Sequence, residues 1–153
     1  TIPNLTVVMG CDYASTRKLV RAAAEYYGPV YLRFTRDAVP DIYDEDEEFI
    51  IGKAKELRSG KDVAIIANGE IVSLALEACD ALASMGIHAT LLDMHTIKPL
   101  DTEAVSKVLR ECKGVVTVED HNIINGLGSA VCEVAALANL PPISVCWQKT
   151  GLL

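Results

Sequence analysis

Short runs of Val, Ile and Leu alternate along the chain with segments whose apolar residues recur at helical spacing. The runs predict strands over residues 5–9, 30–34, 49–54, 62–67, 89–94, 115–118 and 143–147. The periodic segments predict helices over residues 13–27, 71–85, 102–112 and 128–138. Strands that are apolar throughout and joined by helices indicate a parallel or mostly parallel sheet with helices on both faces.

The ends of these helices carry the expected signals. Asp12 and Asp101 precede helical segments, where a short acidic side chain accepts hydrogen bonds from free backbone amides. Gly28 and Gly86 follow helical segments and are expected to end them. In the helix over 71–85, one apolar stripe is predicted to face the sheet, formed by Ile71, Leu74, Ala75, Ala78, Leu82 and Met85.

The charge is concentrated in one place. The chain has a formal net charge of −7, and six acidic residues lie between positions 41 and 48. Without them, 14 basic and 15 acidic residues remain, so we interpret 41–48 as a solvated acidic connector. Residues 1–40 then form a partial β-α-β piece that cannot cover both faces of its own sheet. Residues 49–153 suffice for a compact domain, and we expect the chain to begin inside a larger polypeptide.

Composition excludes several classes of function. The chain has no basic stripe, which argues against nucleic acid as a partner, and no apolar run of the ~20 residues that a membrane span needs. The five cysteines form no C-x-x-C pair, which favours a reduced, cytoplasmic location. His88, His95 and His121 lack the spacing of a zinc site, so no metal ligand is predicted.

Two loops that follow predicted strands carry candidate chemistry. In the segment 119–130, Glu119 and His121 could form a carboxylate–imidazole pair beside a glycine-containing loop that binds an anion. In the segment 94–101, His95 and Lys98 could hold a phosphate or carboxylate. For both we favour a structural interpretation, in which the first loop is a tight turn and the second is shaped for Asp101 to cap the next helix.

Arg36 is a different kind of candidate. It follows the end of the predicted strand 30–34, and no helical period accounts for its position. A guanidinium group offers a planar set of donors that suits a phosphate. The alternative is a surface arginine that pairs with the acidic run which follows.

Taken together, these segments resemble the C-terminal part of the transketolase family of thiamine diphosphate enzymes, in particular the C-terminal subunit of two-subunit transketolases. The resemblance covers almost the whole chain in family order. It rests on the stretches Pro3–Val8, Gly28–Arg36, Gly52–Ala54, Asp62–Gly69, Leu92–Asp101, Val116–His121 and Gly126–Val131.

The resemblance implies a fold and one binding residue. The fold class is α/β: residues 49–153 would be a three-layer α/β/α sandwich with a mostly parallel five-stranded sheet whose first strand is antiparallel. Residues 1–40 would be the C-terminal remnant of a pyrimidine-binding domain, followed by the linker 41–48. By resemblance, Arg36 binds the phosphate of a sugar substrate, and the C-terminal domain contributes no catalytic residue.

The resemblance also implies what lies elsewhere. Family enzymes hold thiamine diphosphate and Mg²⁺ through a Gly-Asp-Gly…Asn motif in a separate domain, and this chain has no match to it. The cofactor-activating Glu and the substrate-binding His would precede Thr1. We therefore expect no cofactor on this chain, inactivity alone, an N-terminal transketolase polypeptide as its partner, and a homo-oligomer, such as a dimer, in the assembled enzyme.

The expected reaction is transfer of a two-carbon ketol unit from a ketose phosphate to an aldose phosphate, as in the pentose phosphate pathway. Two alternatives stay open: a noncatalytic dimerisation or regulatory module, and the equivalent piece of a deoxyxylulose-phosphate synthase or of a 2-oxoacid dehydrogenase β subunit. The sequence departs from the family pattern at Asn125, which replaces the usual first glycine of a Gly-Gly-Leu-Gly turn, and at 146–150.

Overall fold

The computed structural model describes residues 2–36, 38–122, 124–139 and, for the backbone, 144–147. Twelve elements follow in chain order: β1 (Thr6–Met9), α1 (Tyr13–Glu25), β2 (Val30–Arg33), β3 (Lys55–Arg58), β4 (Val63–Ala67), α2 (Ile71–Ser84), β5 (Ala89–Asp93), β6 (Thr96–Lys98), α3 (Thr102–Glu111), β7 (Val115–Glu119), α4 (Leu127–Leu137) and β8 (Ser144–Trp147). The predicted strand start at Ile143 and the departure at 148–150 lie outside the described residues.

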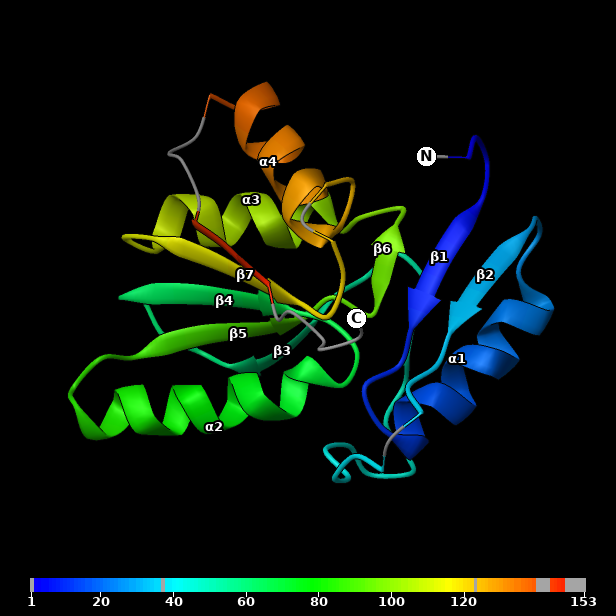
Figure 1. Ribbon diagram of the computed structural model, residues 1–153, viewed down its shortest axis with the longest axis horizontal. Helices are drawn as coiled ribbons and strands as arrows, with labels where there is room; N and C mark the ends of the chain where they lie inside the picture. Colours follow the sequence, from blue (N-terminus) through cyan, green and yellow to red (C-terminus); the bar gives the residue numbers. More distant parts are fainter. Residues whose placement is uncertain (1, 37, 123, 140–143, 148–153) are drawn as a thin grey trace, which may run out of the picture.

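The larger sheet has five strands in the order β3-β5-β4-β7-β8. All neighbours are parallel except β3, which runs antiparallel to β5. Helix α2 covers one face, and α3 and α4 cover the other (Figure 1). This is the α/β/α sandwich that the sequence predicts, including the antiparallel first strand, and we refer to it as the C-terminal domain.

Side chains of the central strand β4 divide between the two faces. Ala64 and Ile66 pack in the cluster beneath α3 and α4, whereas Ile65 and Ala67 pack in the cluster beneath α2. Because successive strand residues point to opposite faces, this division explains why the strand is apolar at every position.

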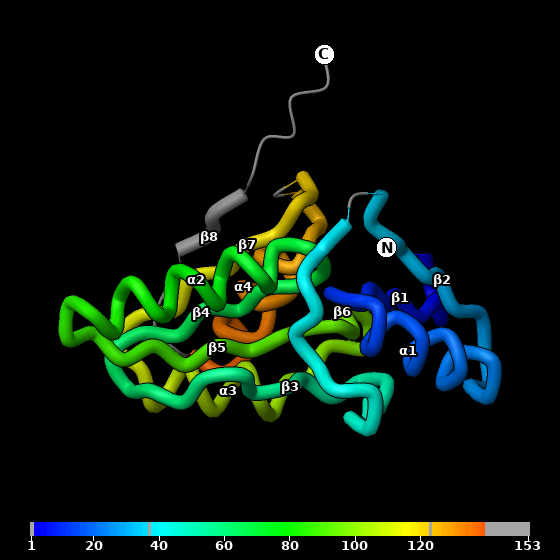
Figure 2. Tube along the Cα trace, turned by 90° about the horizontal axis from the view of Figure 1, so that it is seen from below, coloured from blue at the N-terminus to red at the C-terminus, as the bar shows by residue number. Residues whose placement is uncertain are grey.

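A second sheet of three strands has the order β2-β1-β6. Strands β1 and β2 are parallel and, with α1, form what we call the N-terminal unit. Strand β6 belongs to the second half of the chain and pairs antiparallel with β1, for example Val8 with Thr96. Figure 2 shows β6 beside β1, between the C-terminal domain and the rest of the N-terminal unit. The expectation of an irregular loop over 94–101 is therefore wrong at 96–98, where edge pairing with β1 orders a short strand.

The prediction of a strand over 49–54 is also wrong. Those residues form no strand, and Gly52 has a positive φ of 89°. Phe49 is buried against Tyr43 and His95 rather than within a sheet. The real strand, β3, follows at 55–58 and reads as polar because it lies at the edge of the larger sheet.

The buried face of helix α2 only partly matches the stripe that the periodicity predicts, since Ile71 and Ala75 are buried but Leu74 is not. Its buried residues are Ile71, Val72, Ala75 and Cys79, while Leu74 and Met85 are 51% and 73% exposed. Leu and Ala residues occur around most of this helix, so apolar spacing alone does not fix which side packs on the sheet.

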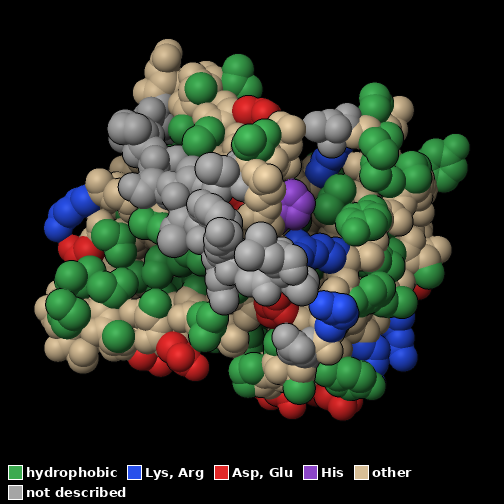
Figure 3. Space-filling model, in the orientation of Figure 1, with side chains coloured by type: hydrophobic (Ala, Val, Ile, Leu, Met, Phe, Trp, Pro, Cys, Tyr) green, Lys and Arg blue, Asp and Glu red, His purple; other side chains and the backbone are tan. Residues whose placement is uncertain are grey.

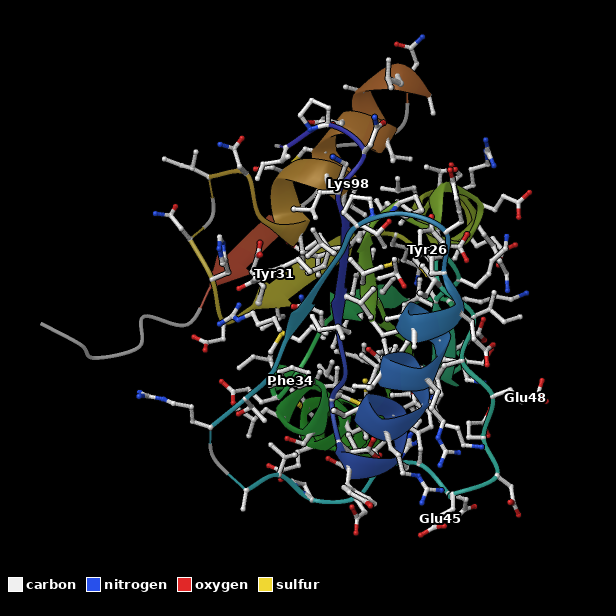
Figure 4. All side chains as sticks on the ribbon, turned by 90° about the vertical axis from the view of Figure 1, so that its right-hand side faces the viewer. Tyr26, Tyr31, Phe34, Glu45, Glu48 and Lys98 are labelled. Carbon is white, nitrogen blue, oxygen red and sulfur yellow. The ribbon has the colours of Figure 1, made fainter. Side chains whose placement is uncertain are left out.

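The segment 41–48 follows the surface but is attached to both parts of the molecule. The backbone amides of Ile42 and Tyr43 donate to Oδ2 of Asp12, at 2.9 and 2.8 Å. Arg17 pairs with Glu45, and Lys55 pairs with Glu47. Figure 4 shows Glu45 and Glu48 on this segment as it passes α1. Its acidic side chains are mostly exposed, as predicted, but its apolar residues are docked. In the described part of the chain, no helix is long and apolar enough to cross a membrane.

Candidate functional site

A cleft of about 570 Å³ separates the small sheet from helix α4 and the loop that precedes it. The small sheet contributes Tyr31, Arg33 and Lys98, and the opposite wall includes His121 and Leu127. Figure 3 shows basic side chains gathered between the two parts of the molecule and hydrophobic ones spread over the N-terminal unit. The cleft thus brings together residues from both ends of the chain.

Arg33 bridges the two walls of this cleft. Its Nη2 atom donates to the carbonyl of Asp120 at 2.8 Å and lies 3.6 Å from the carboxylate of the same residue. Arg33 and Tyr31 project from one face of β2 because they are two residues apart on a strand. In the sequence analysis, Arg33 appears only within a stretch that resembles the family. Its place two residues after Tyr31 on a predicted strand is the signal that could have identified it as a residue of the cleft.

Glu119 has a structural role. Its two carboxylate oxygens accept hydrogen bonds from the backbone amides of Leu127 and Gly128, at 2.7 and 2.8 Å, so it caps the start of α4. A Cβ atom on Gly126 would clash with Oε2 of Glu119, which explains the need for glycine there. The structural interpretation of this loop is therefore correct for Glu119.

His121 is exposed and borders the cleft. Its Nδ1 atom lies 3.0 Å from the carbonyl oxygen of Asn122. Within the described residues, no hydrogen bond joins His121 to Glu119, so the candidate carboxylate–imidazole pair is not formed. His121 remains available to a bound group.

The second candidate pair, His95 and Lys98, does not form a joint site, because His95 is buried and Lys98 borders the cleft. His95 has no exposed surface, and its burial lowers the pKa of the ring to about 4, so the ring is neutral at pH 7. Lys98 instead borders the cleft, and its Nζ atom donates to the carbonyl of Ile2 at 2.5 Å. Asp101 accepts a hydrogen bond from the amide of Ala104 and caps α3, as predicted.

Arg36 lies beyond the end of β2, exposed and outside the lining of the cleft. Within the described residues it forms no ion pair, so the predicted alternative of pairing with the acidic run is not observed there. The preceding residue, Thr35, donates from its hydroxyl to the carboxylate of Glu70, next to the start of α2. This contact ties the Arg36 loop to the C-terminal domain.

No group of three or more His, Cys, Asp or Glu residues in the described part of the chain could hold a metal ion. Both carboxylate oxygens of Glu119 accept hydrogen bonds from the start of α4, in agreement with its structural role.

Comparison with known proteins agrees with this architecture. Residues 52–150 match the family model described as the transketolase C-terminal domain. The chain is 44% identical over 142 residues to one subunit of the apulose-4-phosphate transketolase of Phocaeicola vulgatus, covering 92% of this chain and 46% of that protein. It is 49% identical over 137 residues to a putative transketolase C-terminal section of Methanocaldococcus jannaschii, covering 88% and 42%.

A solved structure titled a split gene transketolase, inactive beta4 tetramer, superposes with a TM-score of 0.94 at 40% identity. The match covers 98% of this chain and 50% of that one. The chain belongs to the transketolase family, by its C-terminal domain. It spans less than half the length of the two relatives named above.

Proposed function

We propose that this chain is the C-terminal part of a transketolase that transfers a two-carbon ketol unit between sugar phosphates. Its family membership is the observation that carries the proposal. Relatives named as transketolase subunits, one for apulose 4-phosphate and another for 6-deoxy-6-sulfo-D-fructose, match it at 44% and 43% identity. We propose a sugar phosphate as the substrate and do not choose among sugars. The relative named for 6-deoxy-6-sulfo-D-fructose supports ketol transfer but not the phosphate group.

Further polypeptide is needed for that reaction. The chain spans 46% and 42% of two relatives, and the small sheet leaves the outer edge of β2 unpaired within the described residues. Tyr31 and Phe34, labelled in Figure 4, are 53% and 54% exposed on and after this strand. The proposed partner is the N-terminal transketolase polypeptide, which brings thiamine diphosphate and Mg²⁺. We also propose a cytoplasmic homo-oligomer, in line with the tetramer named for the neighbouring structure.

In this proposal Arg36 binds the phosphate of the substrate. Three observations support that role: its exposure, its position after a strand end, and the attachment of its loop to Glu70 through Thr35. A guanidinium group that forms no ion pair within the described residues retains its donors for an incoming phosphate.

Calorimetric titration with thiamine diphosphate and Mg²⁺ tests the assignment of the cofactor. The chain alone is expected to bind neither. Micromolar binding would show a cofactor site within this chain and would contradict the division between two polypeptides.

Reconstitution tests the reaction. An N-terminal transketolase subunit together with a C-terminal subunit extended to the length of its relatives should catalyse ketol transfer, and this chain alone should not. If the chain were a noncatalytic module, neither the reconstituted pair nor this chain alone would show activity. Because a relative that is 38% identical is named 1-deoxy-D-xylulose-5-phosphate synthase, formation of that product is assayed in parallel. Its appearance instead of ketol transfer would assign the chain to that enzyme.

Arg36→Ala in the reconstituted enzyme should raise KM for phosphorylated substrates about ten- to hundredfold, the loss expected for a charge-assisted hydrogen bond. The turnover number should change little. Arg21→Ala, at an exposed position of α1 in the same unit, is the matched control. Equal KM values for the two variants would remove Arg36 from the substrate site.

A further inference from the structure

Three separate segments meet at a buried acidic side chain. Asp93, the last residue of β5, has no exposed surface. Its Oδ2 atom accepts a hydrogen bond from the hydroxyl of Tyr43 at 2.9 Å and from the thiol of Cys11 at 3.5 Å. Tyr43 lies on the connector 41–48, and Cys11 precedes α1, so Asp93 joins the connector and the N-terminal unit to the C-terminal domain.

The surroundings of Asp93 favour a neutral carboxyl group. Its Oδ1 atom is buried without a hydrogen-bond partner in the described residues, and none of the ion pairs there includes Asp93. Its register partner on β3, Lys55, is directed to the connector, where it pairs with Glu47 and donates to the carbonyl of Glu48. Asp12 is close enough to repel a negative charge on Asp93, and Lys55 is close enough to attract it. Burial raises the pKa of Asp93 to about 7, although the bonds from Tyr43 and Cys11 favour the ionised form.

The other ionisable groups at this junction remain in one state near neutral pH. Burial raises the pKa of Cys11 and of Tyr43, so both stay protonated and act as donors. Burial alone would raise the pKa of Asp12, but hydrogen bonds from Ser15 and from the connector amides lower it, so Asp12 stays ionised. His95, whose ring packs on Phe49, stays neutral.

We propose that Asp93, Tyr43 and Cys11 form a buried proton-binding site that couples docking of the connector to pH. The docked connector favours a neutral carboxyl group at Asp93, because burial outweighs the hydrogen bonds from Tyr43 and Cys11 that favour the ionised form. When Asp93 loses its proton, the buried negative charge forms no ion pair within the described residues, and Lys55 attracts it only from a distance. Hydration of that charge requires the Tyr43 side chain to move away. Asp12 keeps its hold on the connector backbone, so the connector would leave the C-terminal domain and stay with the N-terminal unit.

The direction of the pH effect follows from linkage. Asp93 binds its proton more tightly when the connector is docked, with a pKa near 7, than when it is hydrated, with the ordinary value of 3.8. Docking is therefore complete at low pH and weakens as the pH rises between these two values. Above pH 7 both states are ionised and the effect reaches a plateau.

Hydrogen exchange of the connector tests this inference, with Asp93→Asn as the matched variant. An Asn side chain keeps the shape and the acceptor for Tyr43 but has no proton to lose. The ratio of protection factors, wild type over Asp93→Asn, should fall about tenfold for each pH unit between roughly pH 5 and 6.5 and level off above about pH 7. Because His95 is present in both proteins, its own titration affects both protection factors and cancels in the ratio. A ratio that is constant with pH would overturn the proposal.

A direct titration keeps the test independent of how well the variant folds. The side-chain carboxyl ¹³C resonance of Asp93 in the wild-type chain should titrate well above the ordinary value of 3.8, towards 7. In Tyr43→Phe the connector should lose protection at acidic pH, where the hydrogen bond from Tyr43 to Asp93 is formed. A midpoint near 4 would overturn the proposal, as would a connector whose protection is unchanged in Tyr43→Phe.

Discussion

Asp12, Asp101 and Glu119 are buried carboxylates, each 7% exposed or less, and each accepts hydrogen bonds from backbone amides at the start of a helix. Such amides lack partners within the helix, and the helix dipole favours a negative charge beside them. These three acidic residues therefore fix local structure.

Glu119→Ala should lower the free energy of unfolding by about 1–3 kcal/mol, because two buried amides lose their acceptor. Chemical denaturation monitored by circular dichroism measures this. The control is Glu133→Ala, an exposed acidic position on the same helix, which should change stability by no more than about 0.5 kcal/mol. Equal effects of the two substitutions would mean that the Glu119 contacts contribute nothing.

Asn125 explains a departure from the family pattern. It has a φ of 61°, in the left-handed region that glycine adopts freely and that Asn tolerates better than other residues. Asn125→Gly should therefore leave the thermal midpoint unchanged or raise it, whereas Asn125→Val should lower stability by about 1–2 kcal/mol. A thermal melt of both variants measures this, and a valine variant as stable as the wild type would contradict the backbone argument.

The candidate site could be predicted only in part from single residues. The capping roles of Asp12 and Asp101 follow from local sequence, because each bonds an amide three residues ahead. The cap that Glu119 provides was not predicted, because it reaches amides eight and nine residues away across a loop. The cleft does not follow from local sequence either, because Arg33 and His121 reach it through contacts between distant segments. The burial of Asp93 and His95 could not be predicted either. Asp93 is in contact with Tyr43 of the connector, and His95 is in contact with Phe49.

At the scale of elements, buried strands and capped helices were predictable, and edge strands were not. Strands β4, β5 and β7 have helices on both faces and are apolar at most positions. Strand β3 has one neighbour and alternates half-buried with exposed side chains, so its sequence, Lys-Glu-Leu-Arg, resembles a loop. Strand β6 exists because β1 offers an edge to it, and nothing local in Thr-Ile-Lys requires a strand.

The pairing of β1 on both sides changes what hydrogen exchange should show. An isolated β-α-β piece would exchange rapidly throughout, but β1 lies between β2 and β6, and Val8 has no exposed surface. The amides of β1 should therefore be protected at least about tenfold more than those of the edge strand β2. Exchange resolved by mass spectrometry compares them, with β4 as the protected reference. Equal rates in β1 and β2 would mean that the β6 pairing does not persist in solution.

At the scale of the whole molecule, the N-terminal unit and the C-terminal domain are held together by β6, by the connector and by the pair of Arg33 with Asp120. Two buried groups at this junction, Asp93 and His95, respond to pH in opposite directions. Folding suppresses the charge of each, so protonation of Asp93 stabilises the fold whereas protonation of His95 destabilises it.

His95 gives the last prediction. Its pKa is near 4 in the folded chain and 6.5 in the unfolded one, so the unfolded chain binds the extra proton between these values and stability rises with pH across that window. The free energy of unfolding of the wild type, relative to His95→Gln, should increase by up to about 3 kcal/mol from pH 4 to pH 6.5 and then stay constant. Urea denaturation at each pH measures the difference, with His88→Gln at an exposed position as the control. A difference independent of pH would mean that His95 is protonated as readily in the folded chain as in the unfolded one.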